Sequence, residues 1–347
     1  MTVARYWTGV VALLTLLCIS TSAAPPSNED SADRTLIVLA APSATDPYYR
    51  SLRKEILDFQ TAFAKQILGR DNVIILADQR TLKILSEKLP SDILLEAPMR
   101  DIWIRDFAPV LPNRPVLFRY SAAAQSGNQE DADEVQAAFV RFAQEVGVTF
   151  ERTSWILDGG NVVDNGLDKA IVTDRFLSDN HLDKEQAIQI LRDQLGVQQV
   201  AILTADPEDR LAHVDGMVLF TDSNTVAITH YGGEYQAAME QELRNAFPDI
   251  QIVEIESTFD DHAFDPNFGS AKGIYVNATV TDHAIYLPVF GLETDSTALS
   301  KIRASTHREV VPIDAEKMGQ MGGSVRCLSA QMKGENARRL IEAARKK

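Results

Sequence analysis

The chain has 347 residues, of which 45% are hydrophobic and 7% aromatic, and its formal net charge is −15. This length allows one large domain or two, and no linker rich in proline, glycine and serine divides the chain after its first residues. The acidic charge disfavours binding to nucleic acid or to an anionic membrane surface, and it is compatible with a cationic substrate.

Residues 1–23 have the pattern of a secretory signal peptide. One charge, Arg5, precedes the apolar run 9–19, and small residues occupy positions 20–24. The run is shorter than the about 20 residues that span a bilayer, and the proline at position 25 favours cleavage after Ala23. We therefore expect an exported protein, periplasmic or secreted, that has no membrane association after cleavage and a formal charge of −16. An uncleaved membrane anchor is the alternative.

Residues 24–34 are rich in proline, serine and acids, and we expect them to form a disordered leader. A single folded domain is expected over 35–347. It begins with the buried strand 35–40, and the first helix is expected to start at Asp46–Pro47, an N-cap followed by proline. Further helices are predicted over 131–146, 183–195, 234–246 and 295–304, and further strands over 73–76, 200–203, 250–253 and 310–313.

A polar element follows a helix and a strand in each of five successive units. These elements contain Asp106, Asp158, His213 with Asp215, Asn277, and Cys327. Such a recurrence indicates closed radial symmetry, with the site at the centre. A common open α/β sheet is the alternative, although it would gather its site at one switch point.

Cys327 is the only cysteine that remains once Cys18 leaves with the signal peptide. Exported proteins usually pair their cysteines or lack them. A lone thiol is either a buried small hydrophobe or a nucleophile.

The other polar elements favour the nucleophile. His213 and Asp215 are two residues apart in a strand-like run, so both side chains are expected on one face. A cysteine with a histidine and carboxylates suits covalent catalysis, and several carboxylates suit a guanidinium, which they bind through paired hydrogen bonds. A cysteine protease needs one orienting group rather than several acids. A zinc site is the competing use, but the ligand spacing for it is missing.

Each element also has a purely structural interpretation. Asp106 could pair with Arg105 or Arg100, and His213 could be a satisfied core histidine. Asp158 could cap a turn at 159–160, and Asn277 could stabilise a bend. Their joint occurrence favours a shared site.

As an ordered set, these residues resemble the agmatine deiminase and bacterial-type peptidylarginine deiminase family. The resemblance rests on the segments 103–106, with Pro109, and 158–161, 213–215, 275–277 and 322–327. It covers nearly all of the chain after residue 34. It implies an α/β fold, the five-bladed propeller (pentein) of guanidino-group-modifying enzymes. It also implies hydrolysis of a guanidine to a ureido group and ammonia, without metal or cofactor.

The resemblance also implies residue roles. Cys327 would attack the guanidinium carbon, Asp106 and Asp215 would hold the guanidinium nitrogens, and His213 would transfer protons. Asp158, which stands where relatives carry glutamate, would orient His213. The substrate pocket would be lined by Trp103, Asn277, Gly322 and Gly323.

Asn277 also begins an Asn-Ala-Thr glycosylation acceptor. A glycan there would block the site, so we expect an unmodified asparagine or a bacterial origin.

The substrate is less well defined. Agmatine-specific members tend to carry an Asn-x-Trp-Gly segment where this chain has 118–121, and exported peptidylarginine members use two arginines, for which only Arg119 is a candidate. We expect agmatine first, with free arginine and arginine at a peptide C-terminus, the latter held through Arg119, as the alternatives. A non-catalytic exported binding protein with a degenerate site is a second alternative. The sequence leaves the oligomeric state open.

Overall fold

The computed structural model describes residue 28 and residues 34–258, 262–264 and 269–346. The predicted signal peptide and most of the predicted leader lie outside these residues. Asn28 of the leader is buried, and its side-chain amide forms two hydrogen bonds of 2.8 Å with the backbone of Val73. These hydrogen bonds attach the segment before strand β1 to the folded part of the chain.

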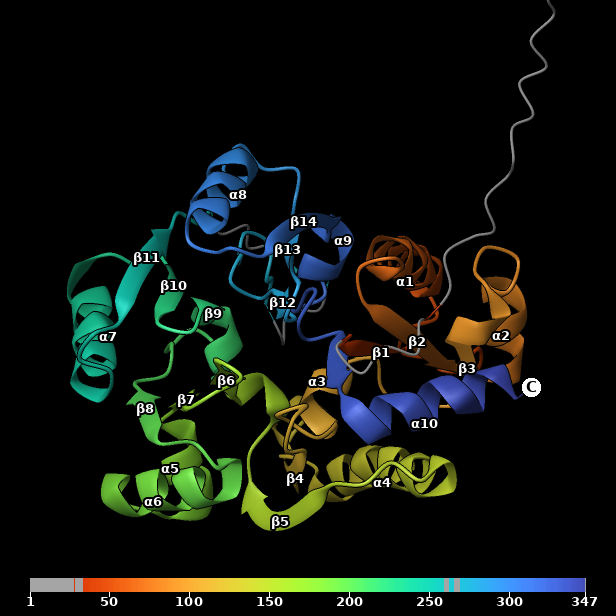
Figure 1. Cartoon of the computed structure of the whole chain (residues 1–347), viewed down its shortest axis with the longest axis horizontal. Helices are drawn as coiled ribbons and strands as arrows, with labels where there is room; N and C mark the ends of the chain where they lie inside the picture. The colour runs from red at the N-terminus through yellow and green to blue at the C-terminus, as the bar shows by residue number, and fades with distance from the viewer. Residues whose placement is uncertain (1–27, 29–33, 259–261, 265–268, 347) are drawn as a thin grey trace, which may run out of the picture.

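The described strands form five small sheets (Figure 1). The first has the order β15-β1-β2-β3, with β15 (Ser329–Met332), β1 (Leu36–Ala40), β2 (Asn72–Ala77) and β3 (Leu94–Glu96). The second pairs β4 (Val116–Arg119) with β5 (Glu151–Ile156). The other three consist of β6 (Val163–Asp164), β7 (Lys169–Thr173) and β8 (Gln199–Leu203); of β9 (Val218–Asp222), β10 (Thr225–Thr229) and β11 (Gln251–Ile255); and of β12 (Thr279–Val280), β13 (Ala284–Val289) and β14 (Glu309–Asp314).

Every sheet contains a parallel strand pair whose connection includes a helix, and the first sheet has a second such pair, β2 with β3. Parallel neighbours need such a crossover because the end of the first strand and the start of the second lie at opposite ends of the sheet. The connecting helices are α1 (Arg53–Ile67), α4 (Gln129–Val146), α5 (Arg175–Asn180) with α6 (Lys184–Leu195), α7 (Gly233–Ala246) and α8 (Asp295–Ala304).

In each sheet, an antiparallel partner lies beside the first strand of one parallel pair. β6, β9, β12 and β15 take this position in four sheets, and in the second sheet Val110 forms a single antiparallel bridge to Val116. Each of the five polar elements comes a few residues before such a partner in the sequence. The same connection therefore recurs five times and places each polar element at an equivalent point of its unit.

Figure 1 shows the result for three sheets, in which β6, β9 and β12 lie nearest the middle of the view. Helices α6, α7 and α8 lie at its outer edge. The short helix α3 (Ile104–Phe107), which carries Asp106, also lies near the middle.

Strand β1 is buried on both faces, as expected for a strand inside a covered sheet. Its alternate residues belong to two hydrophobic cores: Ile37 and Leu39 pack in the core that contains α1, and Leu36, Val38 and Ala40 pack in the core that contains α4 and α10 (Gly334–Arg345).

The sequence predicted most boundaries to within about two residues, and two expectations were wrong or incomplete. The first helix starts at Arg53 and not at Asp46, because the Asp46 carboxylate accepts a hydrogen bond of 2.8 Å from the Tyr48 amide and forms a turn. Helix α10 was not predicted. The remaining helical segments are α2 (Gln79–Leu85), α9 (Glu316–Gly319) and the 3-10 turns η1 (Ser91–Ile93), η2 (Ala123–Gln125), η3 (Gly159–Asn161) and η4 (Val214–Gly216).

The predicted α/β class is confirmed, and five separate sheets replace the open single sheet that was the alternative. None of the helices in the described ranges is both apolar enough and long enough to cross a bilayer.

Candidate active site

A cavity of about 1110 Å³ brings most of the predicted residues together. Its lining includes Trp103, Asp106, His213, Asp215, Asn277, Gly322, Gly323 and Cys327. These residues come from all of the polar elements except 158–161. Asp158 lies behind His213, and Arg119 lies elsewhere on the molecule.

His213 lies between two carboxylates. Its Nε2 is 3.1 Å from Oδ2 of Asp158, and its Nδ1 is 3.8 Å from Oδ1 of Asp106. Burial alone would lower the pKa of His213, but the charges of Asp106 and Asp158 outweigh burial and raise it. The imidazole is therefore protonated at neutral pH and can act as a proton donor.

The predicted same-face strand for His213 and Asp215 is wrong. His213 is the residue before the 3-10 turn η4, and Asp215 lies inside that turn. Both side chains still reach the cavity, because the turn rather than the alternation of a strand directs them there.

Asp158 reaches His213 although it is shorter than glutamate. Its two carboxylate oxygens accept hydrogen bonds of 2.7 Å from the backbone amide and the hydroxyl of Ser121. The Ser121 hydroxyl also accepts a hydrogen bond of 2.8 Å from Arg175. Although burial raises the pKa of Asp158, its hydrogen bond to His213 and the charges of His213 and Arg175 hold it below the usual value. Asp158 is thus fixed as an anion that orients the imidazole.

Cys327 is held by Asn277. The Asn277 amide nitrogen lies 3.1 Å from Sγ of Cys327, and its amide oxygen accepts hydrogen bonds from the Cys327 backbone at 3.4 Å and from the Ser324 hydroxyl at 3.0 Å. Oδ2 of Asp215 lies 3.9 Å from Sγ. Burial and the charges of Asp215 and Asp106 raise the pKa of the Cys327 thiol well above its usual value.

The buried position of Asn277 also bears on glycosylation. The side chain is 3% exposed, and its amide nitrogen is used within the site. A glycan on this nitrogen is incompatible with the observed contacts.

Two glycines permit the close approach of the polar elements. A Cβ atom on Gly323 would lie 2.6 Å from the Trp103 ring and 3.1 Å from Cβ of Cys327. On Gly160 it would lie 2.6 Å from Nδ1 of His213 and 2.7 Å from Oδ1 of Asp106, whose carboxylate accepts a hydrogen bond of 2.9 Å from the Gly160 amide. Any larger residue at these positions would displace the reacting groups.

Asp106 and Asp215 are the carboxylates that face the cavity. Burial raises the pKa of both. Neighbouring carboxylates raise that of Asp106 further, whereas Arg326 acts in the opposite direction on Asp215. A cation that entered the cavity would stabilise the ionised form of both acids.

The expected binding role of Arg119 is not supported by its position. Arg119 lies at the end of β4, its side chain is 43% exposed, and its guanidinium forms hydrogen bonds of 3.1 and 2.7 Å with the Asp133 carboxylate on α4. It does not line the cavity. The Arg119 side chain therefore lies outside the cavity and is partly exposed to solvent.

The outer part of the cavity is acidic and aromatic. Its described lining includes the acids Asp46, Asp101, Asp131, Asp206, Glu208 and Asp209 and the aromatic residues Tyr48, Tyr49, Tyr231, Tyr235 and Phe264. Among these described lining residues, Arg100 is the only arginine or lysine, and it forms an ion pair with Glu134.

Sequence reasoning missed several residues that support the site, namely Ser121, Arg175, Arg105 and Arg326. The last two are adjacent to Asp106 and Cys327 in the sequence, and that adjacency was the only available signal. Within the described ranges, no group of three or more His, Cys, Asp or Glu residues has the geometry of a metal site.

Comparison with known proteins identifies the family. The sequence model of the Porphyromonas-type peptidyl-arginine deiminase family matches residues 27–332. The chain belongs to this family. Among curated relatives, a Lactococcus lactis protein provisionally named agmatine deiminase is 24% identical over 313 residues, which cover 78% of this chain and 85% of the relative.

Solved structures agree with this membership of the Porphyromonas-type peptidyl-arginine deiminase family. The agmatine deiminase of C. jejuni has a TM-score of 0.73 at 19% identity, and the match covers 89% of this chain and 94% of that one. A Porphyromonas gingivalis structure provisionally described as an arginine deiminase has a TM-score of 0.68 at 21% identity, with 90% and 97% coverage. At these identities the likeness establishes a shared fold.

Proposed function

We propose that this protein hydrolyses the guanidino group of a small cationic guanidine, agmatine first, to a ureido group and ammonia. The observation that carries the proposal is the convergence of Cys327, His213, Asp106 and Asp215 on one cavity. Membership of the deiminase family and the agmatine deiminase names of relatives support it.

The first half of the reaction forms a covalent intermediate. The substrate guanidinium pairs with Asp106 and Asp215, and its positive charge lowers the raised pKa of the Cys327 thiol, which loses its proton to solvent. The resulting thiolate forms a C–S bond with the guanidinium carbon. A C–N bond then breaks, and His213 gives its proton to the departing ammonia. The product of this half is an S-alkylthiouronium on Cys327.

Water completes the reaction. Neutral His213 accepts a proton from a water molecule that attacks the same carbon, the C–S bond breaks, and the thiolate returns with the ureido product. Asp158 keeps the imidazole ring in the orientation that both proton transfers need. No redox partner is consumed, and atoms balance as one guanidine and one water giving one urea derivative and one ammonia.

The charge of the cavity favours agmatine over a substrate with a carboxylate. Agmatine ends in an ammonium, which the acidic lining attracts. The carboxylate of free arginine or of a C-terminal arginine would face the same acids, and among the described lining residues the only arginine or lysine is Arg100, which is paired with Glu134. The alternative of a peptidyl substrate is favoured by the size of the cavity, about 1110 Å³, which exceeds the ~300–1,000 Å³ range typical for drug-sized ligands.

The experiment measures ureido-product formation from agmatine, arginine and a peptide with C-terminal arginine, for the wild type and Cys327→Ala. Agmatine should be turned over with the highest kcat/KM, and the variant should be inactive. Turnover of the peptide alone would replace agmatine as substrate. No turnover of any guanidine would favour the non-catalytic binding protein.

The arrangement of the sheets supports the second half of the fold expectation, a five-bladed α/β propeller. The support is the recurrence of one unit in five sheets and the antiparallel pairing of β15 with β1, which joins the last unit to the first. A crystal structure that shows a gap between two neighbouring units would contradict closure.

Export is also part of the proposal. It is supported by the signal-like pattern of 1–23 and the acidic leader. Expression of the full chain in a bacterium, followed by fractionation and N-terminal sequencing, should find a periplasmic or secreted form that begins at Ala24. A full-length cytosolic product would contradict it.

A further inference from the structure

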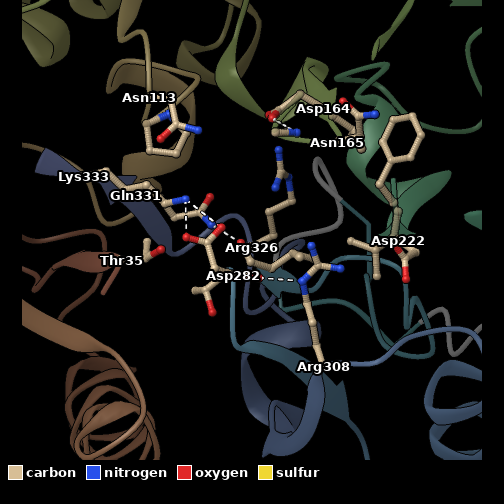
Figure 2. Close-up of a pocket in the computed structure, with 17 residues that line it drawn as sticks. Thr35, Asn113, Asp164, Asn165, Asp222, Asp282, Arg308, Arg326, Gln331 and Lys333 are labelled. Carbon is tan, nitrogen blue, oxygen red and sulfur yellow. Dashed lines mark hydrogen bonds and ion pairs between the residues drawn. The ribbon is translucent and has the colours of Figure 1, made fainter. Parts of the chain in front are cut away.

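Arg326 lies between the active-site cavity and a second, smaller one. It is 6% exposed, and it lines a polar cavity of about 70 Å³ together with Arg308, Lys333 and three aspartates. Figure 2 shows the side chains of Arg326 and Arg308 in this cavity. On the other side, Nε of Arg326 lies 3.5 Å from Oδ2 of Asp215.

The guanidinium of Arg326 is held from two directions. Its Nη2 donates a hydrogen bond of 2.6 Å to the Val162 carbonyl, which follows the turn η3. Its backbone amide donates to the Asn277 carbonyl at 3.2 Å, and Cys327 is the next residue. Arg326 therefore contacts the segments that carry Asp215 and Asn277 and immediately precedes the nucleophile.

This position is unfavourable for a cation unless a carboxylate compensates. Burial of a charge is expensive without a partner, and Nε of Arg326 has no hydrogen-bond partner within the described residues. The guanidinium of Arg105, which is also buried, adds a like charge nearby. The ionised carboxylate of Asp215 is the group that offsets these terms.

The negative charge of Asp215 is also unfavourable in a buried position unless cations compensate it. Asp215 is 2% exposed, and the groups that act on it are Arg326 from the segment before β15, Arg105 from α3 and His213 from the start of η4, together with the acids Asp209 and Asp106 and the Cys327 thiol, whose Sγ lies 3.9 Å from Oδ2. Burial and Asp209 favour the neutral acid, whereas Arg326, His213 and Arg105 favour the carboxylate. Of these three groups, Arg326 lowers the pKa of Asp215 the most.

We propose that Arg326 is a positioning residue that holds the Asp215 side chain as an oriented carboxylate, ready to receive the guanidinium of the substrate. The inference rests on the proposed function for its kinetic consequence, but its electrostatic part concerns the free protein. Because the guanidinium of Arg326 reaches Asp215 from the side of the smaller cavity, it leaves the face toward the substrate open.

The direct test is carbon-13 NMR of the aspartate carboxyl groups in the purified protein, with the Asp215 resonance assigned by its loss in Asp215→Asn. In Arg326→Gln the Asp215 titration midpoint should rise by at least about one pH unit, and in Arg326→Lys by less. Arg308→Gln is the matched control, because Arg308 donates to the carbonyls of Thr281 and Thr221 rather than to a carboxylate. An unchanged midpoint in folded Arg326→Gln would overturn the proposal, even with the wild type active.

Kinetics give a second readout. In Arg326→Gln the acid limb of kcat/KM for agmatine should move to higher pH by the same interval, with KM affected more than kcat and with activity recovering as pH rises. A purely structural role would lower activity by one factor at every pH, and that result would reject the inference. If the wild type turned over no guanidine, the proposed function would fail, and the NMR titration would still decide the role of Arg326.

Discussion

The carboxylate of Asp158 lies 3.1 Å from Nε2 of His213, on the far side of the imidazole from Asp106. Asp158 is itself held by the backbone amide and the hydroxyl of Ser121. The imidazole is thereby fixed between an acid that faces the cavity and an acid that does not. This arrangement separates binding of the substrate from orientation of the proton donor.

Replacement of Asp158 by asparagine should lower kcat by roughly 10²–10⁴-fold, because the imidazole loses its orienting anion. The charge of Asp158 raises the pKa of His213, so its removal lowers that pKa, and the alkaline limb of kcat should move to lower pH. Steady-state kinetics across pH measure both effects. Asp133→Asn, on the surface of α4, is the control. An unshifted alkaline limb in Asp158→Asn would contradict the assignment.

The wild-type pH profile should be displaced to the alkaline side of ordinary values. Asp215 has a raised pKa, so kcat/KM is lost as pH falls through that value. His213 also has a raised pKa, so its proton, and with it the rate, is lost only as pH rises through a value above the usual range. Agmatine turnover in buffers of constant ionic strength tests this. An optimum on the acid side of neutrality would show that other groups control the rate.

Alkylation of Cys327 by iodoacetamide should be slow at neutral pH in the free protein, since burial and two carboxylates raise the pKa of the thiol. The rate should increase toward alkaline pH. Asn277→Ala should slow labelling further, because the amide that lies 3.1 Å from Sγ is lost. Mass spectrometry of the labelled peptide follows the reaction. Fast labelling of the wild type at neutral pH would place the thiol in a different electrostatic environment.

Gly323→Ala should reduce activity and stability together. The added Cβ would lie 2.6 Å from the Trp103 ring, and such overpacking costs about 1–3 kcal/mol of unfolding free energy. Urea denaturation and kcat/KM for agmatine are the measurements. Addition of Trp103→Leu should restore the lost stability, because it removes the obstructing ring, without restoring full activity. A stable, fully active Gly323→Ala protein would mean that the loop around Cys327 adapts freely.

Arg119→Ala should leave kcat/KM within about twofold of wild type for agmatine and for a C-terminal-arginine peptide, as expected for an exposed ion pair. The reason is that Arg119 pairs with Asp133 outside the cavity. Side-by-side assays of both substrates with the wild type and Arg119→Ala test this prediction. A selective loss with the peptide would restore Arg119 as a carboxylate ligand.

The sequence predicted the repeating helices and strands well because most of the predicted strands are short apolar runs, of which β1 and β2 are buried on both faces. It failed at Asp46–Pro47, where a turn and a helix start share the same local signal. Most of the site could be predicted because its residues cluster in short motifs. The contacts of Ser121 and Arg175 with Asp158 could not, since they join residues 37 and 17 positions apart and leave no pattern in the chain.

Strand β15 begins two residues after Cys327, and it lies antiparallel to β1, the first strand of the fold. The nucleophile is therefore positioned by the pairing of the two ends of the chain. A ribosome that has made only the first four units has produced every acid and the histidine but no competent enzyme. Activity can begin only once β15 has been made, and loss of either β1 or β15 would silence the centre of the molecule.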